Sequence, residues 1–199
     1  MNDNYDLSKL RKKPKRKNSR SKGHTFERQI AKLLNDRFNT TEFSRSPGSG
    51  AFATTHTLPD HLKIYGDLIT PIKFKYCIEC KKGYNKENLY SLYNYSSDFW
   101  KFVEQCEKDS KKSNKLPLLI FKQDRQPTLA LVKHPHQFTQ GVYPYITLTT
   151  QKNGYEVEKY SMFLLDELLK SDDISWFEKE FFLIAAAVLG GMQLRCLPL

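Results

Sequence analysis

The stretch Gly66-Asp67-Leu68-Ile69-Thr70, followed after Pro71 to Lys73 by Phe74-Lys75-Tyr76-Cys77-Ile78-Glu79-Cys80-Lys81, predicts two β-strands joined by a turn. Side chains alternate along a strand, so Glu79 and Lys81 are expected on one face and Ile78 and Cys80 on the other. Asp67 opens the first strand, and pairing of the two strands would place it beside Glu79. The sequence therefore predicts two carboxylates and one ammonium close together on an otherwise apolar sheet.

Such a carboxylate pair is costly by itself, because like charges a few ångströms apart repel. Mg²⁺ would remove that cost, since it takes one or two carboxylates together with waters and phosphate oxygens. The ion can acidify a water molecule and offset charge on a phosphate under attack, and Lys81 could assist at both points. The alternative is a surface hairpin in which Glu79 and Lys81 form a solvated ion pair.

A helix is predicted from about Lys22 or His24 to Phe38, because apolar side chains recur at the spacing of one buried face: Phe26, Ile30, Leu33, Leu34 and Phe38. Glu27 lies at the edge of this face, where a half-buried carboxylate needs a partner. Arg28 or Lys32 on the same helix could be that partner, and a metal site is the other alternative.

A first core strand is expected from Thr41 to Ser46, ending in a loop that begins Ser46-Pro47-Gly48-Ser49-Gly50. Glycine and proline allow the backbone of such a loop to approach a phosphate closely. Ser46 and Ser49 offer hydroxyls, and Arg45 offers a planar charged group suited to phosphate. An ordinary turn is the alternative for this loop.

These motifs in this order resemble the PD-(D/E)XK nuclease superfamily: Glu27 on a helix, the Arg45 to Gly50 loop, Asp67, and Glu79-x-Lys81. The closest likeness is to archaeal-type Holliday-junction resolvases and related phage nucleases, over roughly residues 22 to 133. The sequence departs from the superfamily's name in having Gly66, not proline, before the aspartate. A true Pro-Asp occurs at Pro59-Asp60, so Asp60 is a rival to Asp67.

The resemblance implies a Mg²⁺ site, with Mn²⁺ as a possible substitute, held by Asp67, Glu79 and Glu27. It further implies that Lys81 acts on the water and phosphate, that Ser46 belongs to a serine loop contributing to cleavage, and that the active form is a homodimer. Residues expected to bind DNA are Arg45, Ser49, Lys82, Lys12, Lys13, Lys15, Arg16, Lys17, Arg20 and Lys22.

The charge of the chain favours a polyanionic partner: 199 residues carry a formal net charge of +10. The segment from Lys9 to Lys22 holds nine basic residues and no acidic one, and with Asp3 and Asp6 it contributes +7. Such a block repels itself, so residues 1–21 are expected to form a flexible basic arm that binds DNA without sequence specificity. A solubilising tail or a localisation signal is the alternative.

The fold class expected is α/β, with a restriction-endonuclease-like core of helix, mixed central sheet and helix at residues 22–135. After Gly83, an aromatic-rich segment leads into a helix that ends before Leu116, and Gln105 on it falls where some similar proteins carry a glutamine near the site. Leu116–Phe121 and Thr128–Val132 are expected to complete the sheet. Residues 136–199 would form a C-terminal α+β extension: a hairpin around Asn153-Gly154, then helices at Met162–Lys170 and Trp176–Leu189. A lid, a dimer element or a partner-binding element stay open for it.

Several other functions are disfavoured. Cys77 and Cys80 would face opposite sides of a strand, which argues against zinc. No phosphate-binding loop of the ATPase type is present, so no nucleotide cofactor is expected. Four cysteines without a signal peptide indicate a cytoplasmic setting, the host cytoplasm for a phage protein, and no apolar run is long enough to cross a membrane. The main prediction is a Mg²⁺-dependent endonuclease acting on branched or duplex DNA, most closely a junction resolvase. A restriction-type or non-specific endonuclease and a non-catalytic DNA-binding module are the alternatives.

Overall fold

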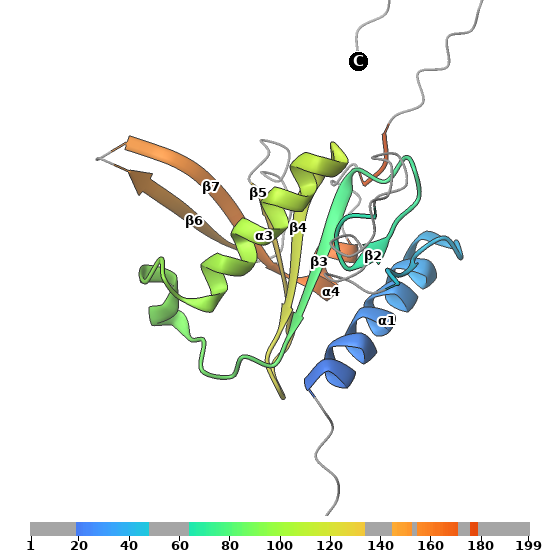
Figure 1. Ribbon diagram of the computed structural model, residues 1–199, viewed down its shortest axis with the longest axis horizontal. Coiled ribbons are helices and arrows are strands. Elements are labelled where there is room, and N and C mark those ends of the chain that lie inside the picture. The colour runs from blue at the N-terminus through green and yellow to red at the C-terminus, as the bar shows by residue number, and fades with distance from the viewer. Residues whose placement is uncertain (1–18, 48–63, 134–144, 153–154, 171–175, 179–199) are drawn as a thin grey trace, which may run out of the picture.

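The computed structural model describes residues 19–47, 64–133, 145–152, 155–170 and 176–178 (Figure 1). Its elements, in chain order, are helix α1 (Ser19–Phe38), strands β1 (Ser44–Arg45), β2 (Leu68–Ile69) and β3 (Tyr76–Lys82), the short 3-10 helix η3 (Leu89–Tyr93), helix α3 (Asp98–Ser113), strands β4 (Leu116–Lys122), β5 (Thr128–Lys133), β6 (Tyr145–Lys152) and β7 (Tyr155–Leu164), and helix α4 (Leu165–Lys170).

A five-stranded mixed sheet forms the centre, in the order β3-β4-β5-β7-β6. Strands β3 and β4 are parallel and are joined through α3, whereas the other neighbouring pairs are antiparallel. A parallel pair needs such a crossover, because a tight turn reverses the chain direction and so joins only antiparallel strands. The predicted α/β class with a mixed central sheet is confirmed. Strand β3 is an edge strand of this sheet, which leaves its outer side open to other parts of the chain.

The two faces of the sheet have separate cores. Helix α3 packs Phe99, Trp100 and Val103 against Leu119 and its neighbours on one face. Helices α1 and α4 cover the other face, where their apolar side chains meet those of β3, β4 and β5: Phe26, Ile30, Leu34, Ile78, Cys80, Leu118, Ile120, Ala130, Val132, Leu165 and Leu168. The odd and even positions of β4 thus enter different cores, and the even positions of β3 enter the core that α1 and α4 cover, as strand alternation requires.

Most predicted elements are present, with shifted ends. Helix α1 begins at Ser19, a few residues before the predicted start, and the expected first strand is reduced to Ser44–Arg45. Helix α3 and the hairpin of β4 and β5 lie where the sequence predicts them.

Three expectations for the second half of the chain are wrong. The central sheet was expected to be complete with β4 and β5. Instead, the β6–β7 hairpin extends it, because β7 pairs with β5. Met162 belongs to β7, so the last helix begins only at Leu165. Trp176–Glu178 is not helical, since Phe177 forms a β-bridge with Phe74. Residues 179–189 of that expected helix lie outside the described residues.

The stretch before β3 also differs from expectation. Strand β2 does not form a hairpin with β3; it pairs antiparallel with β1, with Arg45 opposite Leu68. Only isolated contacts tie this small sheet to β3, among them the hydrogen bond from Asp67 N to Ile78 O of 2.8 Å. Within the described part of the chain, no helix is long and apolar enough to span a bilayer.

Candidate active site

Asp67 is anchored against the edge strand β3 by its main chain and by its side chain. Its backbone N–H donates to Ile78 O at 2.8 Å, and its Oδ2 accepts from the backbone N–H of Cys80 at 2.8 Å. The two contacts lie on either side of Glu79. The proximity of Asp67 and Glu79 therefore holds, although the regular strand pairing expected to create it is absent.

Gly66 explains why no proline precedes this aspartate. Its φ is +78°, a left-handed conformation that proline, fixed near −65°, cannot adopt. A Cβ atom at this position would also lie 2.7 Å from Ile78 O and 2.9 Å from Cys77 Sγ. A glycine lets the backbone press against β3 at this point, and this close approach brings Asp67 to the strand.

We therefore expect Gly66→Ala to destabilise the protein by about 2–5 kcal/mol, combining left-handed strain with a backbone clash. Gly83→Ala is the matched control, because Gly83 also has positive φ (+100°) but nothing within 4 Å of an added Cβ. It should cost only about 1–2 kcal/mol. Urea unfolding of the two variants measures the difference, and equal losses would show that the close approach at Gly66 is unimportant.

Glu79 is the most buried acidic residue in the described part of the chain, with 1% of its surface exposed. Strand alternation places it on the α3 side of β3, and its Oε1 lies 2.5 Å from Lys81 Nζ. Apart from this ion pair, Oε1 has no hydrogen-bonding partner among the described residues. Burial, and secondly the neighbouring Asp67 carboxylate, raise the pKa of Glu79 to about 8 despite Lys81. The Lys81 ammonium therefore does not by itself compensate the negative charge of an ionised Glu79.

Lys81 is held by three groups at once. Besides Glu79, its Nζ donates to Gln105 Oε1 of α3 at 3.1 Å and lies 5.3 Å from the centroid of the Phe102 ring. Burial, the largest single effect, lowers the pKa of Lys81, but the Glu79 carboxylate together with Asp67 outweighs it and the pKa lies above its ordinary value. Lys81 is consequently a cation at neutral pH, able to donate hydrogen bonds but not to accept a proton.

Glu27 approaches from the opposite face of the sheet. It is buried on α1, and its Oε2 accepts from Arg45 Nε at 2.5 Å. Burial and then the Asp67 carboxylate raise the pKa of Glu27, while Arg45 opposes them. Glu27 and Asp67 are thus near enough to interact, and α1, which carries Glu27, covers the face of β3 opposite to the one that carries Glu79.

This two-sided arrangement decides how many carboxylates can reach one ion. The thiol of Cys80 is influenced by all three, since burial and then Asp67, Glu79 and Glu27 raise its pKa. Even so, the described ranges contain no group of three His, Cys, Asp or Glu side chains placed to hold one metal ion. This includes Cys77 and Cys80, which lie buried in the protein as free thiols.

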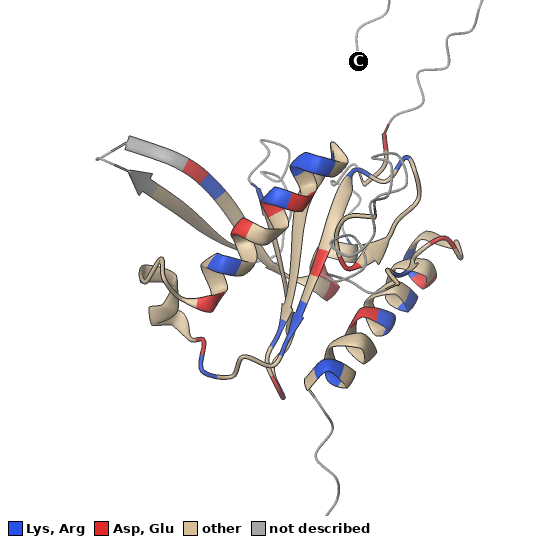
Figure 2. Cartoon of the chain, viewed as in Figure 1, with Lys and Arg blue, Asp and Glu red and all other residues tan. Residues whose placement is uncertain are grey.

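Asp67 and Glu79 fit a divalent ion that keeps part of its water shell. Mg²⁺ needs only one or two protein carboxylates when waters and substrate oxygens complete its octahedron. The raised pKa of Glu79, whose Oε1 has Lys81 as its one partner among the described residues, is the feature that a cation at this point would relieve. Figure 2 shows the acidic and basic positions of β3 following one another along the strand, beside β2.

The predicted loop residues are placed only in part. Ser46 N–H donates to Asp67 O at 2.9 Å, while its Oγ is buried and has no partner in the described part of the chain. Arg45 contacts Glu27 instead of facing solvent, so neither residue is displayed to a DNA strand in this conformation. Ser49 and the rival Asp60 lie outside the described residues.

The predicted DNA-binding lysines and arginines fall into two groups. Arg20 and Lys22 lie in the first turn of α1, and Lys82 ends β3 with its Nζ 5.6 Å from the Phe26 ring centroid. The other predicted residues of the arm lie outside the described residues: Lys12, Lys13, Lys15, Arg16 and Lys17.

The sequence did not identify Asp109 as a residue near the site, and it gave only a weak indication for Gln105. Gln105 was noted from its position on the helix, and its contact with Lys81 could not be derived from spacing. Asp109 lies one turn further along α3, and its charge contributes to raising the pKa of Glu79. The i, i+4 spacing of Gln105 and Asp109 is the one sequence signal that could have linked them.

The chain is similar to a family of phage proteins and to a curated phage protein. The family model described as "Phage putative PDDEXK endonuclease" matches residues 18–178. "Protein D14" of Escherichia phage T5 is 38% identical over 113 residues, which cover 54% of this chain and 66% of that protein. The chain thus spans slightly less than two thirds of that relative. No solved structure matches the chain significantly.

Proposed function

Because the chain belongs to the phage PD-(D/E)XK endonuclease family, we propose that it is a Mg²⁺-dependent endodeoxyribonuclease that hydrolyses DNA phosphodiester bonds. The observation that carries the proposal is the anchoring of Asp67 on both sides of Glu79, with Lys81 Nζ 2.5 Å from Glu79 Oε1. A DNA-binding module that does not cut has no need for buried like charges at a sheet edge, since they cost stability.

Each residue has a role that follows from its surroundings. Asp67 and Glu79 would hold the ion, which when bound favours ionisation of the attacking water and offsets charge on the phosphate. Lys81 donates from its ammonium to the water or to a phosphate oxygen as negative charge develops. Gln105 keeps the Lys81 ammonium aimed at the site, because it holds the Nζ from the α3 side.

We further propose that Glu27 is a third metal-site carboxylate and that Ser46 and Arg45 contact the DNA backbone. Both roles require that the contacts around Arg45 rearrange. Arg45 would have to release Glu27 Oε2 and turn outwards. A bound phosphate could drive this exchange, because it offers Arg45 a bidentate partner. Mn²⁺ is expected to replace Mg²⁺, since both ions accept carboxylate and water ligands.

The basic arm should supply affinity without specificity. We expect deletion of residues 1–18, which leaves α1 whole, to weaken DNA binding and to flatten its salt dependence. The log–log slope should fall by about 0.9 for each phosphate that the arm neutralises in the wild-type complex. Titration of a labelled duplex at several salt concentrations measures the slope. An unchanged slope would return the arm to the role of a solubilising tail.

We propose that the substrate is branched DNA and that the active form is a homodimer. The biological process that we propose is phage recombination in the host cytoplasm. A four-way junction needs two symmetric cuts, and twofold assembly supplies them. The test is incubation of the protein with four-way junction, linear duplex and single-stranded DNA, in Mg²⁺ or in EDTA. Paired nicks in the junction support a resolvase, equal cutting of linear duplex supports a restriction-type or non-specific endonuclease, and binding without any cut supports the module.

A further inference from the structure

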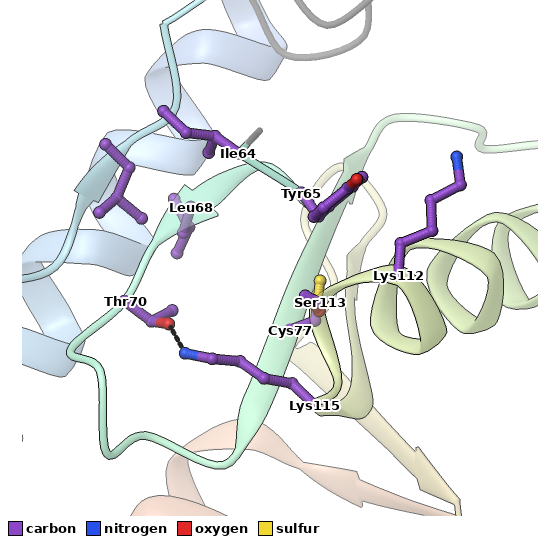
Figure 3. A pocket seen from close by; sticks show the side chains of 9 residues that line it. Ile64, Tyr65, Leu68, Thr70, Cys77, Lys112, Ser113 and Lys115 are labelled. Atoms are coloured by element: carbon purple, nitrogen blue, oxygen red, sulfur yellow. Dashed lines mark hydrogen bonds between the residues drawn. The ribbon is translucent and has the colours of Figure 1, made fainter. Parts of the chain in front are cut away.

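A cavity of about 310 Å³ lies between residues 64–70, the segment that carries Asp67, and the C-terminal end of α3 (Figure 3). Its wall includes Tyr65 from the segment before β2, Cys77 of β3, and Lys112 near the end of the helix. None of these residues has a role in the cleavage chemistry proposed above.

The position of the cavity along β3 ties it to the site. Cys77 precedes Glu79 by two residues and so shares its face of the strand, about 7 Å away at the rise of an extended chain. Tyr65 precedes Asp67 by two residues, although the chain turns between them at Gly66, whose φ is +78°. A ligand in the cavity would therefore contact β3 two residues before Glu79, on the α3 side of the strand where Lys81 also lies.

The lining combines an aromatic ring, an apolar floor and cationic groups. Lys112 is exposed, and its Nζ lies 5.7 Å from the centroid of the half-buried Tyr65 ring. Leu68 is buried below, and burial raises the pKa of Cys77 to about 11, so its thiol stays neutral. The charged side chains that line the cavity are Lys112 and Lys115, whereas the carboxylates of Asp109 and Glu79, which act on Cys77, lie outside the lining. An anionic group of a ligand is therefore expected at the Lys112 rim, with its apolar part against Tyr65 and Leu68.

Lys115 has a different role from Lys112. Its Nζ donates to Thr70 Oγ1 at 2.7 Å and to Pro71 O at 3.2 Å, as the dashed contact to Thr70 in Figure 3 marks. These bonds tie the end of α3 to the segment after β2 and shape the cavity. Lys112 is the lysine available at the rim.

We propose that this cavity binds one unpaired nucleotide of the DNA strand, next to the phosphodiester cut at Asp67 and Glu79. The base would pack against Tyr65 and the apolar floor, and a phosphate of that nucleotide would contact Lys112. This inference rests on the proposed nuclease function and adds its substrate class. A cavity of this size suits a single small ligand, and a paired base must leave the duplex stack to enter it. DNA with an unpaired nucleotide beside the cut is thus the preferred substrate.

The first test uses binding alone and needs no metal. Thymidine 5′-monophosphate is titrated into the full chain in EDTA and followed by NMR, with thymidine and inorganic phosphate as separate ligands. We expect the nucleotide to bind more tightly than either part, and Tyr65→Ala or Lys112→Ala to weaken it about tenfold, in line with the loss of base stacking. Tyr65→Phe should bind normally, as should Lys111→Ala on the same helix. Equal binding of phosphate alone, or normal binding by Tyr65→Ala, would overturn the proposal.

The second test compares cleavage of two duplexes that differ by one unpaired nucleotide at the cut. We expect wild type to cut the unpaired substrate faster than the fully paired duplex, and Tyr65→Ala to reduce this ratio to about one. A preference that survives in both Tyr65→Ala and Lys112→Ala would contradict a role for the cavity. If nucleotide binding follows the expected pattern but no DNA is cut, the nuclease function fails and the cavity stands.

Discussion

Replacing Lys81 by alanine is expected to lower the rate of DNA cleavage by about 10²–10³-fold while leaving DNA affinity within about threefold of wild type. A single donor aimed at charge that develops during the reaction has an effect of this size. Affinity should persist because the basic arm and the exposed lysines supply most of the phosphate contacts. Single-turnover cleavage of a labelled DNA gives the rate, and binding of the same DNA in Ca²⁺ or EDTA gives the affinity.

The matched control for this variant is Lys101→Ala. Lys101 is an exposed lysine of α3 whose Nζ pairs with Asp98 at 3.0 Å, on the same helix that holds Gln105. It should cut at the wild-type rate. A Lys81→Ala protein that is folded, binds DNA and still cuts normally would remove Lys81 from the mechanism.

The second large effect is expected on metal binding. Mg²⁺ at ten times its dissociation constant should stabilise the wild-type protein by about 1.4 kcal/mol, a rise of a few degrees in the melting temperature. Asp67→Asn and Glu79→Gln should each abolish most of this rise, because each removes one of the two carboxylates that would hold the ion. Asparagine keeps an oxygen that can accept from Cys80 N–H, so the local fold should survive. Thermal unfolding with and without Mg²⁺ measures the effect.

Glu79→Gln should also change how the stability of the protein depends on pH in EDTA. The folded pKa of Glu79 is raised from 4.5 to about 8, so the folded protein binds this proton more tightly than the unfolded chain does. Its contribution to stability is therefore fully present below about pH 4.5 and is lost as pH rises towards 8. Glu79→Gln should flatten the fall in stability over this range. An equally steep fall in the variant would mean that another group titrates there.

The local elements could be predicted from the sequence because their patterns are strong. The 3.6-residue repeat of Phe26, Ile30 and Leu34 gives α1, and the alternation in Tyr76–Lys82 gives the edge strand with Glu79 and Lys81 on one face. The closeness of Asp67 to Glu79 was also predicted, but from a strand pairing that the structure does not have.

The parts that failed depend on long-range packing. Nothing in Leu68–Ile69 indicates that it pairs with Ser44–Arg45 instead of with β3, and only the folded structure reveals that Gly66 permits the close approach. The period of α1 places Glu27 near the core, but it does not tell which face of β3 the helix covers. The prediction that Glu27 joins Asp67 and Glu79 at one ion stays a prediction; in the structure Arg45 contacts Glu27 and Lys81 contacts Glu79.

The most direct test of the site is single-turnover cleavage of one labelled DNA across Mg²⁺ concentrations by wild type, Asp67→Asn and Glu79→Gln. We predict that wild-type cleavage is absent in EDTA and rises with Mg²⁺ to a plateau, and that neither variant cuts measurably at any Mg²⁺ concentration although both still bind the DNA. Wild-type cutting that is unchanged in EDTA, or variants that reach the wild-type plateau, would contradict a metal-dependent site built on Asp67 and Glu79.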